Sequence, residues 1–161
     1  MLIPAAALLR QTKNILCAWG MGDDDATLVA DLLVETDLRA IDSHGVSMLP
    51  MYEQMVQAGT LNMRPNAKVE RDSAVVALIN ADAGLGHPIA RHAMALACDK
   101  AAAHGIGAVG VYNSHHFGAA GLYAEMAAER GMLGLIPSSA RSVAVIPTRG
   151  AVPMLGTNPI A

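Results

Sequence analysis

The spacing of apolar residues divides the chain into a helical first part and a second part in which strands and helices alternate. Apolar positions recur at helical spacing in three segments, residues 5–19, 23–38 and 47–58. Gly20 and Gly59 follow the first and third segments, and glycine commonly ends a helix because it adopts a left-handed backbone conformation readily. Residues 1–62 are therefore predicted to form a helical unit.

The pattern changes after this unit, where short apolar runs bounded by turn residues predict strands. Two strands are predicted at 67–69 and 74–79, followed by a helix over 88–104, a strand over 106–111, a helix over 119–130 and a strand over 132–136. This alternation predicts the α/β class, with the layer occupying residues 63–161. The pattern leaves the direction of each strand open.

Composition restricts the functions that the chain can have. Hydrophobic residues make up 53% of the chain and charged residues 16%, which excludes a disordered protein, and the ten methionines are interpreted as core filling. The net charge is −3 and no basic stripe is present, so neither nucleic acid nor a membrane is an expected partner. Cys17 and Cys98 lie far apart, which favours free, buried thiols and a cytoplasmic protein.

The most informative stretch is Tyr112-Asn113-Ser114-His115-His116-Phe117-Gly118-Ala119-Ala120-Gly121. It lies between a predicted strand and a predicted helix, which is where ligands bind in open α/β sheets. Two adjacent imidazoles, with glycines that allow close approach to the backbone, indicate a functional site. The alternative is a helix N-terminus that happens to contain two histidines.

His44 provides a second candidate group, in the segment Asp42-Ser43-His44-Gly45. A histidine with a hydroxyl and a carboxylate nearby can be held in one tautomer and can act as a general acid near neutral pH. Asp42 and Ser43 could instead merely cap the third helix. His87, His92 and His104 are interpreted as ordinary loop or helix-surface residues.

A metal site is disfavoured by the spacing of the histidines. Adjacent residues in an extended chain point to opposite sides, so His115 and His116 would seldom bind one ion. The chain also lacks the H-x-x-x-H motif and a cysteine pair. A metal-dependent hydrolase that uses His44, Asp42 and one of the paired histidines remains a minor alternative, and no nucleophile elbow supports a serine hydrolase.

The segment Gly105-Ile106-Gly107-Ala108-Val109-Gly110 matches the dinucleotide-binding pattern G-x-G-x-x-G. That pattern must follow a strand and begin a helix. Here it follows a predicted helix and leads into a predicted strand. Gly105 is therefore interpreted as a helix stop, and the other glycines as sites of close packing.

Four segments together resemble the type 2 malate/L-lactate dehydrogenase family. They are Asp42-Ser43-His44-Gly45-Val46, Gly84-Leu85-Gly86, Asn113 to Gly121, and Gly156-Thr157-Asn158-Pro159. Members of this family are NAD(P)-dependent reductases of 2-oxo acids that do not use the Rossmann fold, and they include ureidoglycolate and sulfolactate dehydrogenases. The resemblance therefore implies a non-Rossmann α/β fold, NAD or NADP as cofactor, a small 2-oxo or 2-hydroxy acid as substrate, and a homodimer.

The same resemblance implies roles for individual residues. His44 would donate a proton to the substrate carbonyl, Ser43 would orient it or relay the proton, and His116 would be a second catalytic imidazole. The expected cofactor contacts are His116, Phe117, Gly118, Ala119, Ala120 and Ser139. Thr157 and Asn158 would face the substrate, and the family pattern adds no metal ligand.

Two departures from the family pattern matter. Many members have an arginine where this chain has Met48, so charge pairing with a substrate would have to come from Arg39, Arg141 or Arg149, or the substrate differs. Family members also continue well beyond their G-T-N-P segment. The sequence therefore predicts a fragment or a truncated product with little dehydrogenase activity of its own, and a non-catalytic remnant that binds a ligand or a partner is the leading alternative.

Overall fold

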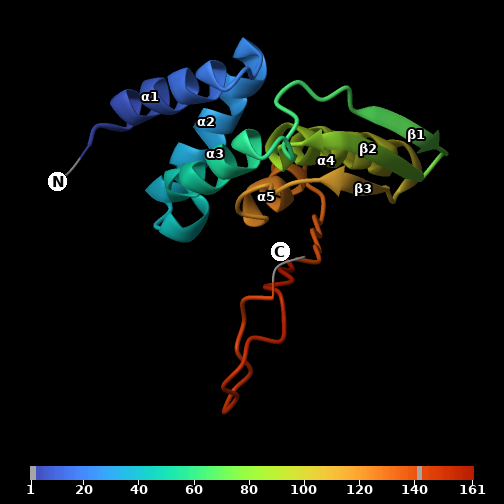
Figure 1. Cartoon of the computed structure of the whole chain (residues 1–161). Coiled ribbons are helices and arrows are strands. Elements are labelled where there is room, and N and C mark those ends of the chain that lie inside the picture. The colour runs from blue at the N-terminus through green and yellow to red at the C-terminus, as the bar shows by residue number, and fades with distance from the viewer. Residues whose placement is uncertain (1–2, 141–142) are drawn as a thin grey trace. The chain divides into compact units, whose positions relative to one another are not determined.

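The computed structural model describes residues 3–140 and 143–161, which form two compact units, Met1–Ala119 and Ala120–Ala161. The first unit contains the predicted helical part and a three-stranded sheet (Figure 1). The α/β class expected from the sequence is confirmed.

Three α-helices form the N-terminal part, α1 (Ala5–Ala18), α2 (Asp23–Leu38) and α3 (Leu49–Gln57). Their apolar faces meet in one core, which contains Leu16, Met21, Ala26, Val29, Ala30, Leu33, Tyr52, Leu61, Met63 and Leu85. Gly20 and Gly59 follow α1 and α3 with positive φ angles of 100° and 67°, as predicted for helix stops. Met63 and Leu85 also belong to this core, so the core includes residues beyond position 62. The predicted division of the chain into a helical unit, residues 1–62, and an α/β layer, residues 63–161, stays a prediction.

The connection between α2 and α3 is tighter than the sequence predicts. Two short 3₁₀ helices, η1 (Asp42–His44) and η2 (Val46–Met48), fill it, so that α3 begins at Leu49. Met48 is half-buried against the helical core. This connection places His44 at the edge of the helical part.

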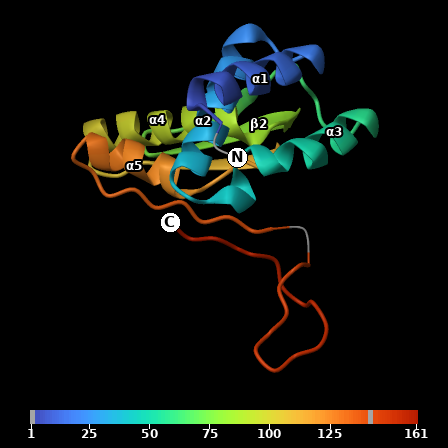
Figure 2. The same cartoon turned by 90° about the vertical axis from the view of Figure 1, so that its left-hand side faces the viewer.

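The sheet has the order β1-β2-β3. Strand β1 (Lys68–Asp72) pairs antiparallel with β2 (Val76–Gly84), which pairs parallel with β3 (Ala108–Ser114). Helix α4 (Gly86–His104) connects the two parallel strands and runs along the sheet in both views (Figures 1 and 2). Ile79 and Ala81 of β2 pack with Ile89 and Ala93 of α4, which gives the sheet one buried face.

The glycines of the G-x-G-x-x-G match have structural roles, as predicted. Gly105 ends α4 in a left-handed conformation with φ of 83°. A Cβ atom added at Gly107 would lie 2.0 Å from the carbonyl oxygen of Ala97 in α4, so only glycine allows this approach. These residues pack β3 onto α4 and do not begin a helix.

The second unit begins with α5 (Gly121–Glu129) and continues as a long irregular segment. Two isolated bridges, between Pro137 and Ile160 and between Val145 and Leu155, pair its two arms. The strand predicted at 132–136 is not formed in this described segment. Leu133 and Leu135 are 99% and 66% exposed, so no neighbouring strand or helix covers their side chains as a buried strand would require.

Cys17 and Cys98 are free thiols, Cys98 being buried and Cys17 half-buried. None of the helices in residues 3–140 and 143–161 combines the length and apolar character needed to cross a lipid bilayer.

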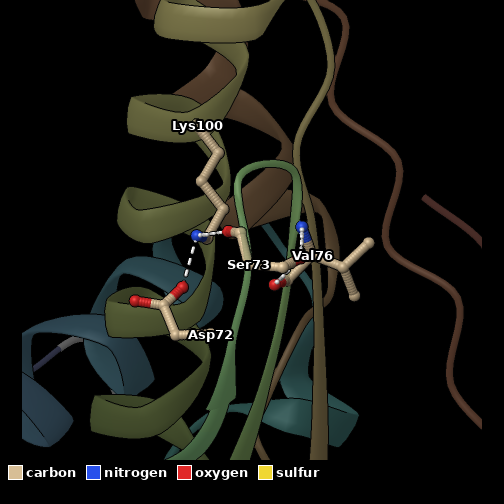
Figure 3. A network of polar contacts seen from close by, with 4 residues as sticks. All are labelled: Asp72, Ser73, Val76 and Lys100. Atoms are coloured by element: carbon tan, nitrogen blue, oxygen red, sulfur yellow. Dashed lines mark hydrogen bonds and ion pairs between the residues drawn. The ribbon is translucent and has the colours of Figure 1, made fainter.

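Lys100 of α4 ties the helix to the turn between β1 and β2 (Figure 3). Its ammonium group lies 2.5 Å from Asp72 Oδ1 and donates to the carbonyl oxygen of Ser73 at 2.5 Å. Ser73 closes the turn through hydrogen bonds with the backbone of Val76. The Lys100 side chain is only 10% exposed, so water screens this ion pair less than it screens a surface pair.

We expect Lys100→Met to lower the free energy of unfolding by about 1–3 kcal/mol, because a charged hydrogen bond of a buried donor is lost while the apolar stem is kept. Urea unfolding followed by circular dichroism measures this change. Lys13→Met is the matched control, since the Lys13–Asp23 pair is 33% and 74% exposed and should contribute less than about 1 kcal/mol. Equal effects of the two substitutions would contradict the prediction.

Candidate active site

The structure brings together two histidines that are far apart in the sequence. His44 lies at the end of η1, and His116 follows the end of β3. Their ring centroids are 5.3 Å apart with the planes tilted by 37°. Both residues are half-buried. The expected convergence of the two imidazoles is therefore present.

Local contacts hold His44 in place. The Ser43 hydroxyl is 2.8 Å from His44 Nδ1, and the backbone N–H of Val46 donates to Asp37 Oδ2 at 3.0 Å. Gly45 lies directly against the same carboxylate, because a Cβ added there would be 1.8 Å from Asp37 Oδ1. Helix α3 has no side-chain cap, so the alternative that Asp42 and Ser43 serve to cap it is wrong.

His116 is held by a tyrosine that the sequence analysis did not single out. Tyr52 of α3 is 1% exposed, and its hydroxyl lies 2.7 Å from His116 Nδ1. The backbone N–H of Gly118 also donates to this nitrogen, at 3.3 Å. Because a backbone N–H can only donate, Nδ1 of the neutral ring is an acceptor and the ring proton is on Nε2. Neutral His116 can therefore donate a hydrogen bond through Nε2.

His115 points away from its neighbour, as the alternation of side chains predicts. Its Nε2 lies 2.8 Å from the carbonyl oxygen of Thr60, whereas His116 faces Tyr52. No group of three or more His, Cys, Asp or Glu side chains within the described residues is arranged to hold a metal ion.

A third histidine belongs to the cluster, and the sequence interpretation of it is wrong. His92 and His104 are exposed on α4, as expected, but His87 is 1% exposed. Its ring centroid lies 6.1 Å from that of His116 and 6.2 Å from that of Tyr52. Its place at the start of α4, after the apolar residue Leu85, gave no signal that distinguished it from a loop residue.

Burial lowers the pKa values of two of these histidines. Desolvation, followed by repulsion from a protonated His116, lowers the pKa of His87 to about 3. Desolvation, followed by repulsion from a protonated His44, lowers the pKa of His116 to about 4. Both rings are therefore neutral at neutral pH.

We expect the lowered pKa of His87 to make the fold sensitive to acid. Its folded-state pKa is below the unfolded value of 6.5, so the unfolded chain binds the proton first and stability falls as the pH drops below about 6.5. The contribution of His87 between pH 7.5 and pH 5 is about 2 kcal/mol. Urea unfolding at these two pH values measures it, and His87→Gln should reduce the difference by that amount. An unchanged difference in the variant would contradict the assignment.

The segment around His116 is fixed against the start of α4 by its backbone. The N–H of Gly86 donates to the carbonyl oxygen of His116 at 2.9 Å, and the N–H of His115 donates to Gly84 at 3.0 Å. A Cβ added at Gly86 would lie 2.6 Å from both the His115 carbonyl oxygen and Phe117 Cβ. This contact explains why the segment Gly84-Leu85-Gly86 has glycine at its last position.

The family model described as "Malate/L-lactate dehydrogenase" matches residues 3–161. The chain belongs to the malate/L-lactate dehydrogenase family. It is 43% identical over 159 residues to the malate dehydrogenase of Pyrococcus abyssi and 40% identical over 148 residues to the malate/(S)-sulfolactate dehydrogenase of Methanothermus fervidus, covering 99% and 92% of this chain.

Solved structures of the malate/L-lactate dehydrogenase family have the same fold. The malate dehydrogenase of Pyrococcus horikoshii superposes with a TM-score of 0.89 at 41% identity, and the sulfolactate dehydrogenase of Methanocaldococcus jannaschii with 0.90 at 35% identity. The match covers 99% of this chain and 46% of each of those chains. The chain spans less than half the length of these relatives. It covers 44% of the length of the Pyrococcus abyssi enzyme and 43% of that of the Methanothermus fervidus enzyme.

The other residues expected from the family pattern are divided between the two units. Phe117, Gly118 and Ala119 follow His116 in the first unit, while Ala120, Ser139, Thr157 and Asn158 belong to the second. Within that unit, Asn158 Oδ1 accepts a hydrogen bond from the backbone N–H of Ala140 at 2.9 Å. The cofactor and substrate contacts of these residues stay predictions.

The arginines considered as replacements for the one expected at Met48 have different positions. Arg39 lies at the end of α2 and pairs with Glu35 at 2.7 Å. Arg149 is in the second unit, and Arg141 lies outside the described residues. The choice among these arginines stays a prediction.

Proposed function

We propose that this chain supplies the imidazole cluster of an oxidoreductase that moves a hydride between a nicotinamide cofactor and a small 2-hydroxy or 2-oxo acid. The supporting observation is the convergence of His44 and His116, with ring centroids 5.3 Å apart, in a member of the malate/L-lactate dehydrogenase family. The names of its relatives, malate and sulfolactate dehydrogenases, support a substrate with a hydroxyl or oxo group beside a carboxylate.

His44 is the proton donor in this proposal. Hydride arriving at a carbonyl carbon leaves negative charge on the oxygen, and a positioned imidazolium stabilises that charge and then donates its proton. The Ser43 hydroxyl on His44 Nδ1 keeps the ring oriented, so that Nε2 is the atom available to the substrate. In the reverse reaction, neutral His44 accepts the proton from the hydroxyl group of the substrate.

His116 has a different role, which follows from its low pKa and its hydrogen bonds. Burial lowers its pKa to about 4, so it stays neutral when His44 is charged. With Nδ1 accepting from Gly118, its Nε2–H is a neutral hydrogen-bond donor for the substrate oxygen or carboxylate. A charged donor beside a neutral donor suits one developing oxyanion, because two adjacent imidazolium rings would repel each other.

The residues directly after His116 are the proposed cofactor contacts. Phe117, Gly118, Ala119 and Ala120 combine one aromatic side chain with three small residues, a composition that suits a site for a flat cofactor ring. Bound NAD or NADP supplies the hydride. In this proposal these residues and Ser139 hold the cofactor, and Thr157 and Asn158 contact the acid substrate.

The proposal includes a homodimer located in the cytoplasm. Large apolar side chains remain exposed in the second unit, including Leu133, Val152, Met154 and Ile160 at 99%, 66%, 69% and 75%. Exposed apolar surface of this kind favours association with a second chain. Light scattering of the purified chain measures the number of subunits.

Spectrophotometric oxidation of NADH and NADPH with a panel of 2-oxo acids tests the proposal. The panel includes the oxo forms of malate, lactate and sulfolactate. Two proteins are compared, the chain itself and a chimera in which it replaces the matching 159 residues of the Pyrococcus abyssi malate dehydrogenase. Turnover by the chimera, lost when both His44 and His116 are replaced by alanine, supports the proposal. A folded chimera with no turnover of any 2-oxo acid contradicts it.

A second candidate is a module that binds the cofactor without turning it over. Met48 favours it, because many members of the family have an arginine at this position, and methionine cannot pair with the carboxylate of an acid substrate. Calorimetric titration of the 161-residue chain with NADH separates the two. Binding of NADH without turnover of any 2-oxo acid by the chain or the chimera would support the binding module, whereas turnover by either protein would contradict it.

A further inference from the structure

His87 is a buried titratable group that the proposed chemistry does not use. It is the second residue of α4 and is 1% exposed. Neither ring nitrogen has a hydrogen-bond partner among the residues that the structure describes. A buried hydrogen-bonding group without a partner costs about 1–3 kcal/mol, so its presence beside the half-buried His116 requires an explanation.

The neighbours of His87 are the groups that fix His116. The His87 ring meets those of Tyr52 and His116 edge-on, at interplanar angles of 80° and 66°. Its Nε2 faces Gly118 so closely that a Cβ added at Gly118 would lie 2.7 Å away. Tyr52 and Gly118 are the two residues that place hydrogen-bond donors on His116 Nδ1. His87 therefore fills the space between all three.

We propose that His87 is a positioning residue, which by its volume and lack of charge keeps water away from the inner side of His116 and holds that ring in one tautomer. His87 touches no substrate in this role and acts only through Tyr52, Gly118 and His116. The catalytic meaning of the role rests on the proposed function, but the positioning itself does not require turnover.

The physical consequence is a change in the pKa of His116 when the space is emptied. The titratable groups that face His116 are His44, Tyr52 and His87. Truncating His87 leaves a cavity beside the Tyr52 hydroxyl and His116 Nδ1, which is polar and large enough to hold water. Water there reduces the desolvation of His116, the largest cause of its lowered pKa, and offers Nδ1 alternative partners.

NMR titration of the 161-residue chain, labelled with ¹³C and ¹⁵N in histidine, measures this directly. In the unsubstituted chain His116 should titrate at a pKa of about 4 and show the Nε2–H tautomer. His87→Ala should raise the pKa of His116 by about one unit and mix its tautomers. His87→Gln has nearly the same volume and no charge, so it should leave both properties unchanged.

His92→Ala is the matched control, since His92 is exposed on the same helix five residues further along and should have no effect on His116. If His87→Ala does not fold, the smaller truncation His87→Asn is measured in its place and should shift the pKa in the same direction. The proposal is overturned if the truncated variant keeps the pKa and tautomer of His116, or if His87→Gln changes them as much as the truncation does. Because no substrate is used, these results are independent of whether the chain is a dehydrogenase.

Discussion

Replacing His44 with alanine is expected to lower kcat of the chimera by about 10²–10⁴-fold, the usual contribution of a positioned general acid. His44 is the proton donor in the proposal, whereas burial lowers the pKa values of His116 and His87 to about 4 and 3 and keeps both rings neutral. Without His44, the developing oxyanion receives its proton from water. The rate of NADH oxidation under saturating 2-oxo acid measures the loss.

Two further variants make the assignment specific. His116→Ala should also remove most of the rate, because the neutral Nε2–H donor beside His44 is lost. Ser43→Ala should have a smaller effect than either, since the hydroxyl orients His44 through Nδ1 without reaching the substrate. His92→Ala, on the exposed face of α4, should leave the rate unchanged. Full activity in both His44→Ala and His116→Ala would show that the roles are assigned to the wrong residues.

Gly86→Ala is expected to have the second largest effect, although Gly86 is not proposed to contact the substrate. The added Cβ would lie 2.6 Å from the His115 carbonyl oxygen and from Phe117 Cβ, and 3.0 Å from the His116 carbonyl oxygen. Since two of these atoms belong to the backbone, relief requires moving the segment that holds His116. A displacement of about 1 Å at such a group can lower the rate by about 10²-fold, and the strain should cost about 1–3 kcal/mol of stability.

Gly121→Ala is the control for this prediction. Gly121 is likewise the first residue of a helix, α5, and a Cβ added there would meet nothing within 4 Å among the described residues. This substitution should leave the melting temperature unchanged or slightly raised, because alanine is the better helix former. Thermal unfolding and the NADH assay are compared for the two variants. If Gly86→Ala has the same melting temperature and the same rate of NADH oxidation as Gly121→Ala, the close contact at Gly86 does not position His116 and the prediction is wrong.

Local patterns were enough to predict most of the helices and strands. Helix ends at Gly20, Gly59 and Gly105 were predicted correctly, because a left-handed residue is encoded by the glycine itself. The exception was the strand at 132–136. Its apolar composition resembles that of a buried strand, but pairing depends on a partner that local sequence does not specify.

In the candidate site, too, the sequence identifies some residues and misses others. His44 and His116 could be selected from the sequence, because each lies in a polar motif at the boundary of an apolar segment. Tyr52 and His87 could not, since Tyr52 has the helical spacing of a core residue and His87 follows a loop with no pattern that shows burial. Their importance comes from contacts between α3, α4 and the end of β3, which are separated by up to 64 residues along the chain.

The sequence by itself therefore determined the family, the α/β class and the two imidazoles, because these depend on residue types and spacings along the chain. Only the tertiary structure decided that the rings of His87 and His116 stay neutral, which nitrogen of His116 has the proton, and which buried residue packs against it. The physical reason is that pKa values and tautomers follow from desolvation and hydrogen-bond partners, and both are supplied by residues distant in sequence that folding brings into contact.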